Sequence, residues 1–175
     1  MKKVLLIVLF TIFSINLSAR EISDDYGNKV NVPDKITKIY AASPPLTMSL
    51  LAFNPDLVAG LNTPFNEIQK KCVGSAFDKP VVGGFMGQGS SPNFETLVSI
   101  KPDVVVMWGK MQGSQKILEK LNSLGIPVLL VKNESIYDLI SQFDLYAKLS
   151  GNRARADELI AYTKKKSLSY RVSSR

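Results

Sequence analysis

The sequence predicts an α/β fold, a three-layer sandwich in which a mainly parallel sheet is covered by helices on both faces. The runs DVVVM and PVLLV, at residues 103–107 and 127–131, are apolar on both strand faces, which is typical of strands buried between two layers. Such runs alternate along the chain with segments of helical spacing, as in parallel strands joined by right-handed crossover helices. With 45% hydrophobic and 21% charged residues, the composition is that of an ordinary globular domain.

The first nineteen residues indicate an export signal rather than part of the fold. MKK is followed by the apolar run VLLIVLFTIFSINL and then by SAR, the order of a charged region, an apolar region and a cleavage site. We expect cleavage after Ala19. A membrane-spanning helix is the alternative, but the run is short for a bilayer and is interrupted by Thr11, Ser14 and Asn16.

The cysteine content and the net charge limit the cellular compartments and the classes of partner that the chain can have. Cys72 is the only cysteine, so no internal disulfide forms, and it lies too far from the export signal to carry a lipid there. An exported chain without disulfides fits a bacterial periplasm. The net charge is +7, but the basic residues near the C-terminus lack interleaved aromatic side chains, so we expect a solvated helix face and no nucleic-acid partner.

The elements are expected in the following order. They are a hairpin over 20–33, a strand at KIYAA, a helix over 44–53, strands at LVAGL and PVV, a helix over 93–100, the strand DVVVM, a helix over 114–124, the strand PVLLV, and helices over 135–150 and from Arg153. In the helix over 135–150, Ser135 and Asp138 form a capping-box pattern, and Gly151 suits the left-handed position that ends a helix. Its expected apolar stripe is Ile136, Leu139, Ile140, Phe143 and Ala147.

Ligands of an open α/β sheet bind in the crevice outside the carboxyl ends of the strands. Trp108, the only tryptophan, stands just past DVVVM, and we expect it to share that crevice with Phe65, Phe85 and Met111. Packing of Trp108 against a neighbouring helix as part of the core is the alternative.

The glycine-rich run GGFMGQGS fits neither nucleotide motif. Gly87 and Gly89 are followed by Pro92 where a dinucleotide fingerprint requires glycine, and Gly89 is followed by serine where a phosphate loop requires lysine. We interpret the run as a loop that places Phe85 and Gln88 at the rim of the crevice. A simple flexible connection is the alternative.

Catalytic and metal chemistry find little support in the sequence. The chain has no histidine, so the commonest general base, the usual triads and the commonest metal ligand are missing. The acidic residues are scattered, and one cysteine cannot hold zinc. Glu95, in the first turn of a predicted helix, has two open interpretations: a favourable interaction with the helix dipole, or contact with a basic partner.

The segments resemble a known family. The chain from about Glu21 to about Ile160, including DDYGNKVNVP, KIYAASPP, FNPDLVAGLN and LNSLGIPVLLV, is similar to the periplasmic substrate-binding proteins of ABC importers for iron-siderophores, haem and cobalamin. The most specific part is NFETLVSIKPDVVV, which looks like the family's N-L-E-x-I-x-x-L-K-P-D-L-V pattern.

The resemblance implies two Rossmann-like lobes joined by a long rigid helix, with the ligand held between them. It implies an export signal over 1–19, an N-terminal ligand-binding lobe over 20–152 and the start of the inter-lobe helix over 153–175. Glu95 falls on the glutamate that docks against arginines of the membrane permease, so docking outweighs the dipole interpretation. The expected ligand-binding residues are Ser43, Pro44, Asn62, Phe65, Phe85, Gln88, Trp108 and Met111.

The chain also departs from the family pattern. Family members are roughly twice as long, so the second lobe and its docking glutamate are expected to be missing. An aromatic and methionine-rich rim without a basic cluster favours a cobalamin-like, haem-like or other metal-chelate ligand over a strongly anionic catecholate complex, and bare metal ions are not expected to bind without histidine. We expect no catalysis, no resident cofactor and a monomer; the alternatives are a truncated lobe that binds little, or an enzyme on the same scaffold.

Overall fold

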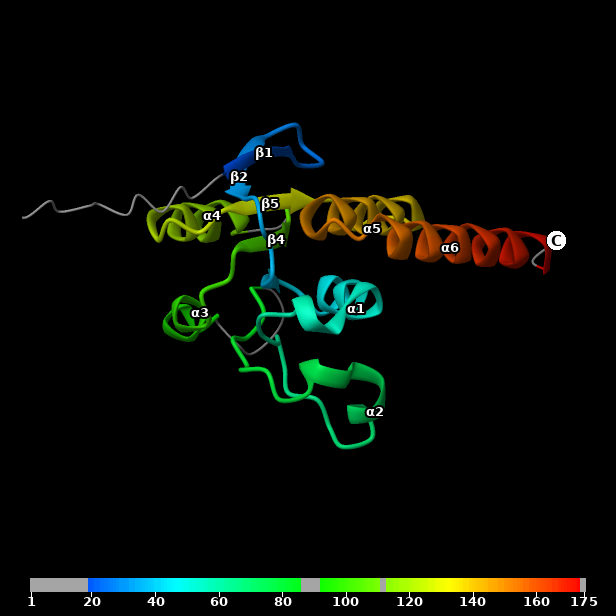
Figure 1. Cartoon of the computed structure of the whole chain (residues 1–175), viewed down its shortest axis with the longest axis horizontal. Helices are drawn as coiled ribbons and strands as arrows, with labels where there is room; N and C mark the ends of the chain where they lie inside the picture. Colours follow the sequence, from blue (N-terminus) through cyan, green and yellow to red (C-terminus); the bar gives the residue numbers. More distant parts are fainter. Residues whose placement is uncertain (1–18, 86–91, 111–112, 174–175) are drawn as a thin grey trace, which may run out of the picture.

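The computed structural model of the protein describes residues 19–85, 92–110 and 113–173. Its helices and strands alternate as expected for an α/β chain (Figure 1). In chain order they are β1 (Ala19–Ser23), β2 (Lys29–Pro33), β3 (Ile39–Ala41), α1 (Pro44–Phe53), α2 (Lys70–Val73), α3 (Phe94–Ile100), β4 (Val104–Trp108), α4 (Ser114–Ser123), β5 (Val128–Val131), α5 (Ile136–Ser150) and α6 (Arg153–Ser173).

The sheet has the order β3-β4-β5, and both strand pairs are parallel. Within the described residues, it continues beyond β3 only through isolated bridges, Ile39 to Val58 and Leu61 to Val81. The prediction of full strands at LVAGL and PVV was therefore wrong. Pro80 has no N–H to donate to a ladder, and the segment before Val58 is a 3₁₀ turn over Pro55–Leu57.

Side chains from the two faces of the sheet pack into two separate hydrophobic cores, which confirms the three-layer α/β fold. Ile39, Val104 and Leu129 pack on the side of α1 and α5. Their sequence neighbours Tyr40 and Val105 pack on the opposite side, with α3 and α4 (Figure 1). Successive strand residues alternate between faces, so strands buried on both sides must be apolar throughout, as DVVVM and PVLLV are.

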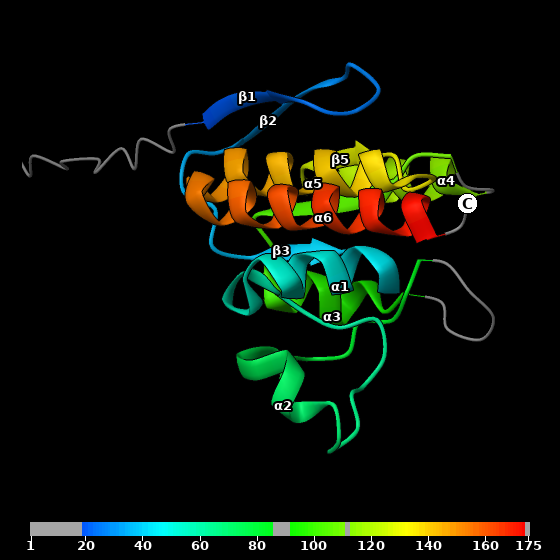
Figure 2. The same ribbon diagram turned by 90° about the vertical axis from the view of Figure 1, so that its right-hand side faces the viewer.

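Helix α5 begins and ends as expected but buries more of its surface. Ser135 and Asp138 form the capping box, and Gly151 has a φ of 79°. The predicted stripe was only partly right, because Ile136 is 41% exposed, whereas Gln142, Leu145 and Tyr146, outside the stripe, are buried. Tyr146 packs against Phe53 of α1, and its hydroxyl lies 3.0 Å from Ser49 Oγ, while α6 runs alongside α5 (Figure 2).

Two arginines tie the ends of the chain to helix C-termini. Arg155 of α6 donates to the carbonyl oxygens of Ala52 and Phe53, at 2.7 and 3.4 Å, where α1 ends. Arg20 of β1 donates to the carbonyl oxygen of Leu149, at 2.6 Å, where α5 ends. Cations at these positions satisfy carbonyl groups that lack a partner within the helix. In the described part of the chain, no helix combines the length and apolar character needed to cross a membrane.

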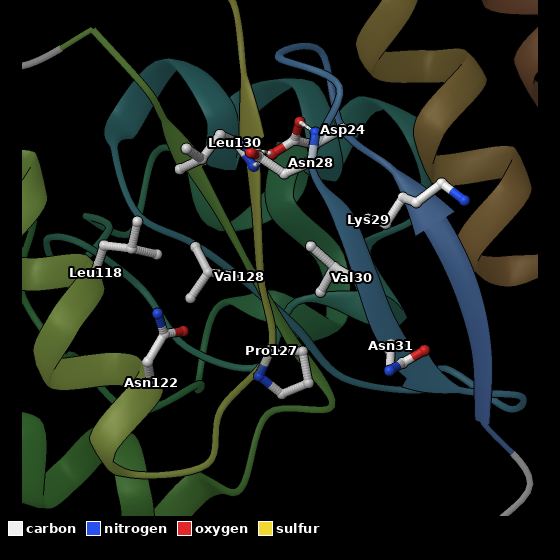
Figure 3. Close-up of a pocket in the computed structure, with 10 residues that line it drawn as sticks. All are labelled: Asp24, Asn28, Lys29, Val30, Asn31, Leu118, Asn122, Pro127, Val128 and Leu130. Atoms are coloured by element: carbon white, nitrogen blue, oxygen red, sulfur yellow. Dashed lines mark hydrogen bonds between the residues drawn. The ribbon is translucent and has the colours of Figure 1, made fainter.

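The hairpin of β1 and β2 covers the outer edge of β5. The Asp25 N–H donates to the Leu130 carbonyl at 3.1 Å, and Asp24 Oδ2 accepts from the Leu130 N–H at 3.2 Å. Between the hairpin, β5 and α4 lies a hollow of about 400 Å³, the hairpin hollow, into which Val30, Leu118 and Val128 project (Figure 3). Of the residues predicted to bind the ligand, none of those that the structure describes lines it.

Candidate functional site

The strand order reverses at β3, and the sequence predicts the ligand crevice outside the carboxyl ends of β3 and β4. The chain leaves β3 through α1 toward Val58 on one side, whereas β4 joins β3 on the other side. Such a reversal is a topological switch point, where open α/β sheets bind ligands. Ala41 pairs with Val106. Ser43 lies two residues beyond β3 as the N-cap of α1, and Trp108 is the last residue of β4, so both lie at the carboxyl ends of neighbouring strands.

Each of these two residues carries a buried polar atom that lacks a partner within the described residues. Ser43 is only 4% exposed, and neither its Oγ nor the Trp108 Nε1 has a hydrogen-bond partner. A buried polar group without a partner is rare and destabilising. Both groups are hydrogen-bond donors, so an acceptor oxygen of a bound ligand would satisfy them together.

The first turn of α1 borders the same place and is apolar. Ser43 is the N-cap but makes no side-chain capping bond, and Pro44 and Pro45 occupy the first positions of the helix. Proline lacks the N–H that binds anions at other helix N-termini. A hollow of about 40 Å³ lies beside this turn and is lined by Pro44, Thr47, Met48, Asn62, Thr63 and Phe65. The structure thus brings together Pro44, Asn62 and Phe65 of the predicted set.

Asn62 belongs to a buried hydrogen-bond network behind the rim. Its Nδ2 donates to the Ala41 carbonyl at 2.9 Å and to the Tyr40 hydroxyl at 3.2 Å, while its Oδ1 accepts from Thr47 Oγ1 at 2.6 Å. The Tyr40 hydroxyl donates to the Gly83 carbonyl, and burial raises the pKa of Tyr40 well above its ordinary value. The network holds the ends of three adjacent chain segments. Sequence reasoning missed Tyr40, because a tyrosine inside a strand carries no signal of its partners.

Phe85 packs beneath the rim. It is buried, its ring contacts Tyr40 edge-on at 5.6 Å and stacks on Phe94 at 5.8 Å. Gly83, two residues earlier, has a φ of 95°, a conformation that glycine adopts without strain. Gln88 and Met111, also predicted to bind the ligand, lie outside the described residues.

Glu95 lies in the first turn of α3, where its side chain is exposed. Asn93 caps this helix by accepting from the Thr96 N–H at 2.9 Å, so capping does not require the Glu95 carboxylate. That carboxylate forms no hydrogen bond or ion pair with the described part of the chain. Its position allows contact with a cationic group of another molecule.

A larger hollow, the α1/α5 groove, was missed by sequence reasoning. It has a volume of about 430 Å³ and is lined by Pro45, Met48, Ser49, Ala52, Asn133, Ser135, Ile136, Leu139, Gln142 and Phe143. Asn133 lies two residues beyond β5, and Pro45 lies four residues beyond β3, so the groove lies near the same rim. Met48 lines both this groove and the small hollow. Met48 lies one turn beyond Pro44 on α1, and this spacing was the feature of the sequence that could have indicated the groove.

Metal ligands do not gather at this rim. Within the described ranges, no group of three or more cysteine or acidic side chains is placed to hold a metal ion, and the sequence contains no histidine. The arrangement offers hydrogen-bond donors and apolar surface, which are suited to binding an organic molecule.

Comparisons with known proteins agree with the fold. Residues 63–168 match the sequence family described as periplasmic binding protein. A comparison with curated proteins gives no match.

Three solved structures illustrate the shared fold. An ABC transporter solute-binding protein from Sulfurospirillum deleyianum is 24% identical with a TM-score of 0.71, over 81% of this chain and 45% of that one. The molybdate-binding periplasmic protein MolA of Haemophilus influenzae is 20% identical with a TM-score of 0.61, over 88% of this chain and 54% of that one. The periplasmic vitamin B12 binding protein of Vibrio cholerae is 16% identical with a TM-score of 0.59, over 79% and 51%. The chain spans about half the length of these proteins.

Proposed function

The chain belongs to the periplasmic binding protein family, and from this membership we propose that it is the N-terminal ligand-binding lobe of a solute-binding protein that serves an ABC importer. Its solute is a metal chelate, namely an iron-siderophore, haem or a cobalamin-like molecule. The lobe works in the periplasm after removal of the export signal, binds the solute without transforming it, and passes it to a permease in the inner membrane.

The unmet donors of Ser43 and Trp108 carry this proposal. They lie at the level where β3 and β4 end, and each is buried without a partner in the described structure. Chelates of iron or cobalt present carbonyl, carboxylate or amide oxygens around the metal, and such oxygens accept hydrogen bonds. One ligand oxygen reaching this level would remove two unfavourable buried groups at once.

The apolar first turn of α1 favours a large organic ligand over a compact oxyanion such as molybdate. Pro44 and Pro45 remove two of the N–H donors that would hold an anion there. Their rings, with Met48 and Phe65, instead offer apolar surface. Ligand sites of this composition suit organic molecules that carry only a few polar atoms.

Ligand titration tests the crevice. Trp108 is the only tryptophan, so its fluorescence reports this position alone. We expect cyanocobalamin, haemin or a ferric siderophore to quench it to saturation, and Ser43→Ala to weaken binding by about tenfold in calorimetry, since one hydrogen bond is lost. Ser99→Ala, on the exposed face of α3, is the control and should bind normally. Absence of binding by every chelate, or equal affinities of the two serine variants, would contradict the proposal.

Charge reversal at Glu95 tests permease docking. In the complete protein, Glu95→Lys should abolish uptake of the solute in cells while leaving ligand affinity unchanged, because the side chain is exposed and lies apart from the unmet donors. Glu119→Lys, an equally simple reversal on the exposed face of α4, should leave uptake intact. Normal uptake by the Glu95 variant would contradict the proposal that Glu95 docks against the permease. It would leave the proposal of ligand binding at Ser43 and Trp108 unaffected.

A further inference from the structure

We propose that the α1/α5 groove is a second binding site, for an uncharged and mainly apolar small molecule. The site goes beyond the proposed function, because neither Ser43 nor Trp108 lines it, and Met48 is the one described residue that it shares with the small hollow beside the first turn of α1. Its volume of about 430 Å³ lies within the range of about 300–1,000 Å³ typical of small-molecule sites.

Large apolar side chains from two helices form opposite walls of the groove. Met48 of α1 is 54% exposed, and Ile136 of α5 is 41% exposed. Leu139 and Phe143 continue the α5 wall toward the core. Apolar side chains that remain exposed around a hollow lose that exposure when an apolar molecule enters, and removal of this surface from water is favourable.

Charge selects the class of ligand. None of the described residues that line the groove is acidic or basic. A charged ligand would give up its hydration there without gaining a counterion, which is strongly unfavourable. The occupant is therefore neutral.

Gln142 adds a hydrogen-bond requirement. This residue is only 1% exposed, and its Nε2 donates to the Lys132 carbonyl at 3.0 Å and to Asn133 Oδ1 at 3.2 Å. Its Oε1 has no partner in the described structure. A buried acceptor in the lining of an apolar groove favours a ligand that carries one N–H or O–H group.

The neutral dye phenylnaphthylamine has this chemistry, since it joins two apolar ring systems through one N–H. We expect its fluorescence to rise to saturation with the full chain, and anilinonaphthalene sulfonate, the same skeleton with a negative charge, to bind at least tenfold more weakly. Phenylnaphthalene, which lacks the N–H, should compete less well than the amine. In the Gln142→Leu variant, which lacks the acceptor Oε1, the amine and phenylnaphthalene should bind with similar affinity.

Lysine substitutions on each wall localise the dye. Met48→Lys and Ile136→Lys change exposed side chains, so the fold tolerates them, and each should raise the dissociation constant at least tenfold. Val98→Lys, on α3 at 44% exposure, is the matched control and should bind normally. Trp108→Phe should also bind the dye normally, because Trp108 does not line the groove; failure of metal chelates to bind therefore leaves this result unaffected.

Three outcomes would overturn the proposal. They are absence of saturable dye binding, equal binding by Met48→Lys and Val98→Lys, and tighter binding of the sulfonate than of the amine. Sedimentation adds a fourth: a dimer that Met48→Lys converts to a monomer would assign the groove to contact between two copies of the chain.

Discussion

The hairpin hollow and the α1/α5 groove have similar volumes, about 400 and 430 Å³, but their polar groups differ. The Asp24 carboxylate beside the hairpin hollow accepts from the N–H groups of Tyr26, Asn28 and Leu130 and from the Asn28 side-chain amide. Gln142 beside the groove leaves its Oε1 without a partner in the described structure. Volume alone therefore does not distinguish a site from a packing defect, whereas unmet polar atoms do.

The difference has a physical basis. A buried carboxylate that accepts several hydrogen bonds stabilises the fold, because its desolvation is offset by charge-assisted bonds. An unmet buried group destabilises the protein until a ligand arrives. Substitutions near the hairpin should therefore change stability, whereas substitutions at the crevice or the groove should change binding.

The largest stability effect is expected at Asp24. Asp24→Ala removes the acceptor of four hydrogen bonds, and we expect the free energy of unfolding to fall by about 3 kcal/mol. Urea denaturation measures this change. Asp34→Ala, an exposed aspartate in the connection after β2, is the control and should lose less than about 0.5 kcal/mol. A small effect at Asp24 would remove the contrast between the two hollows.

Tyr146 should show the next effect, with a pH dependence. Its buried hydroxyl lies 3.0 Å from Ser49 Oγ, so Tyr146→Phe should lose about 1–2 kcal/mol at neutral pH. Burial raises the pKa of Tyr146 well above its ordinary value. The unfolded chain therefore loses the phenol proton first, and stability falls as the pH rises above about 10. The fall should be shallower in the phenylalanine variant, and equal slopes would contradict the assignment.

Ser43 should behave in the opposite way. Its Oγ is buried and unmet in the described structure, so Ser43→Ala should stabilise the unliganded protein by about 1 kcal/mol while weakening the chelate. Thermal unfolding with and without ligand measures both effects. Destabilisation of the unliganded protein would show that the hydroxyl belongs to the fold, as Asp24 does.

Substitution of Asp144 is expected to change the free energy of unfolding least. Its half-buried carboxylate bonds to Lys148 and Arg153, which hold its pKa below the ordinary value. Asp144→Asn should therefore cost less than about 1 kcal/mol at neutral pH. This stabilisation is present above the unfolded pKa of about 3.9 and is lost as the pH falls through the lower folded pKa. The two proteins should converge in acid urea titrations, and a constant difference at every pH would contradict the ion pairing.

The sequence predicted those parts of the fold that depend on local patterns. The bounds of α1 follow from Pro44 and Pro45 at its start, and those of α5 from the Ser135 cap and Gly151. The burial of Tyr146 depends instead on packing with distant α1 and on α6 alongside, which no local periodicity contains.

The candidate site was predictable in its position but not in its hydrogen bonding. Strand ends located Ser43 and Trp108, because parallel strands end at one rim. The polar atoms of Asn62 are hydrogen-bonded because Tyr40 and Thr47 lie beside them. The Ser43 Oγ has no such partner in the described structure, and the sequence does not reveal this difference. Gln142 was missed because a glutamine on a helix is ordinarily exposed.

The arginine contacts at the helix ends bear on the order of folding. Arg20 meets Leu149 across 129 positions of the chain, and Arg155 meets Ala52 across 103. During synthesis from the N-terminus, neither contact forms until the residues beyond position 149 have left the ribosome. Contacts between such distant positions slow folding. Two of the contacts that fasten the lobe therefore form only after the start of α6 has been synthesised.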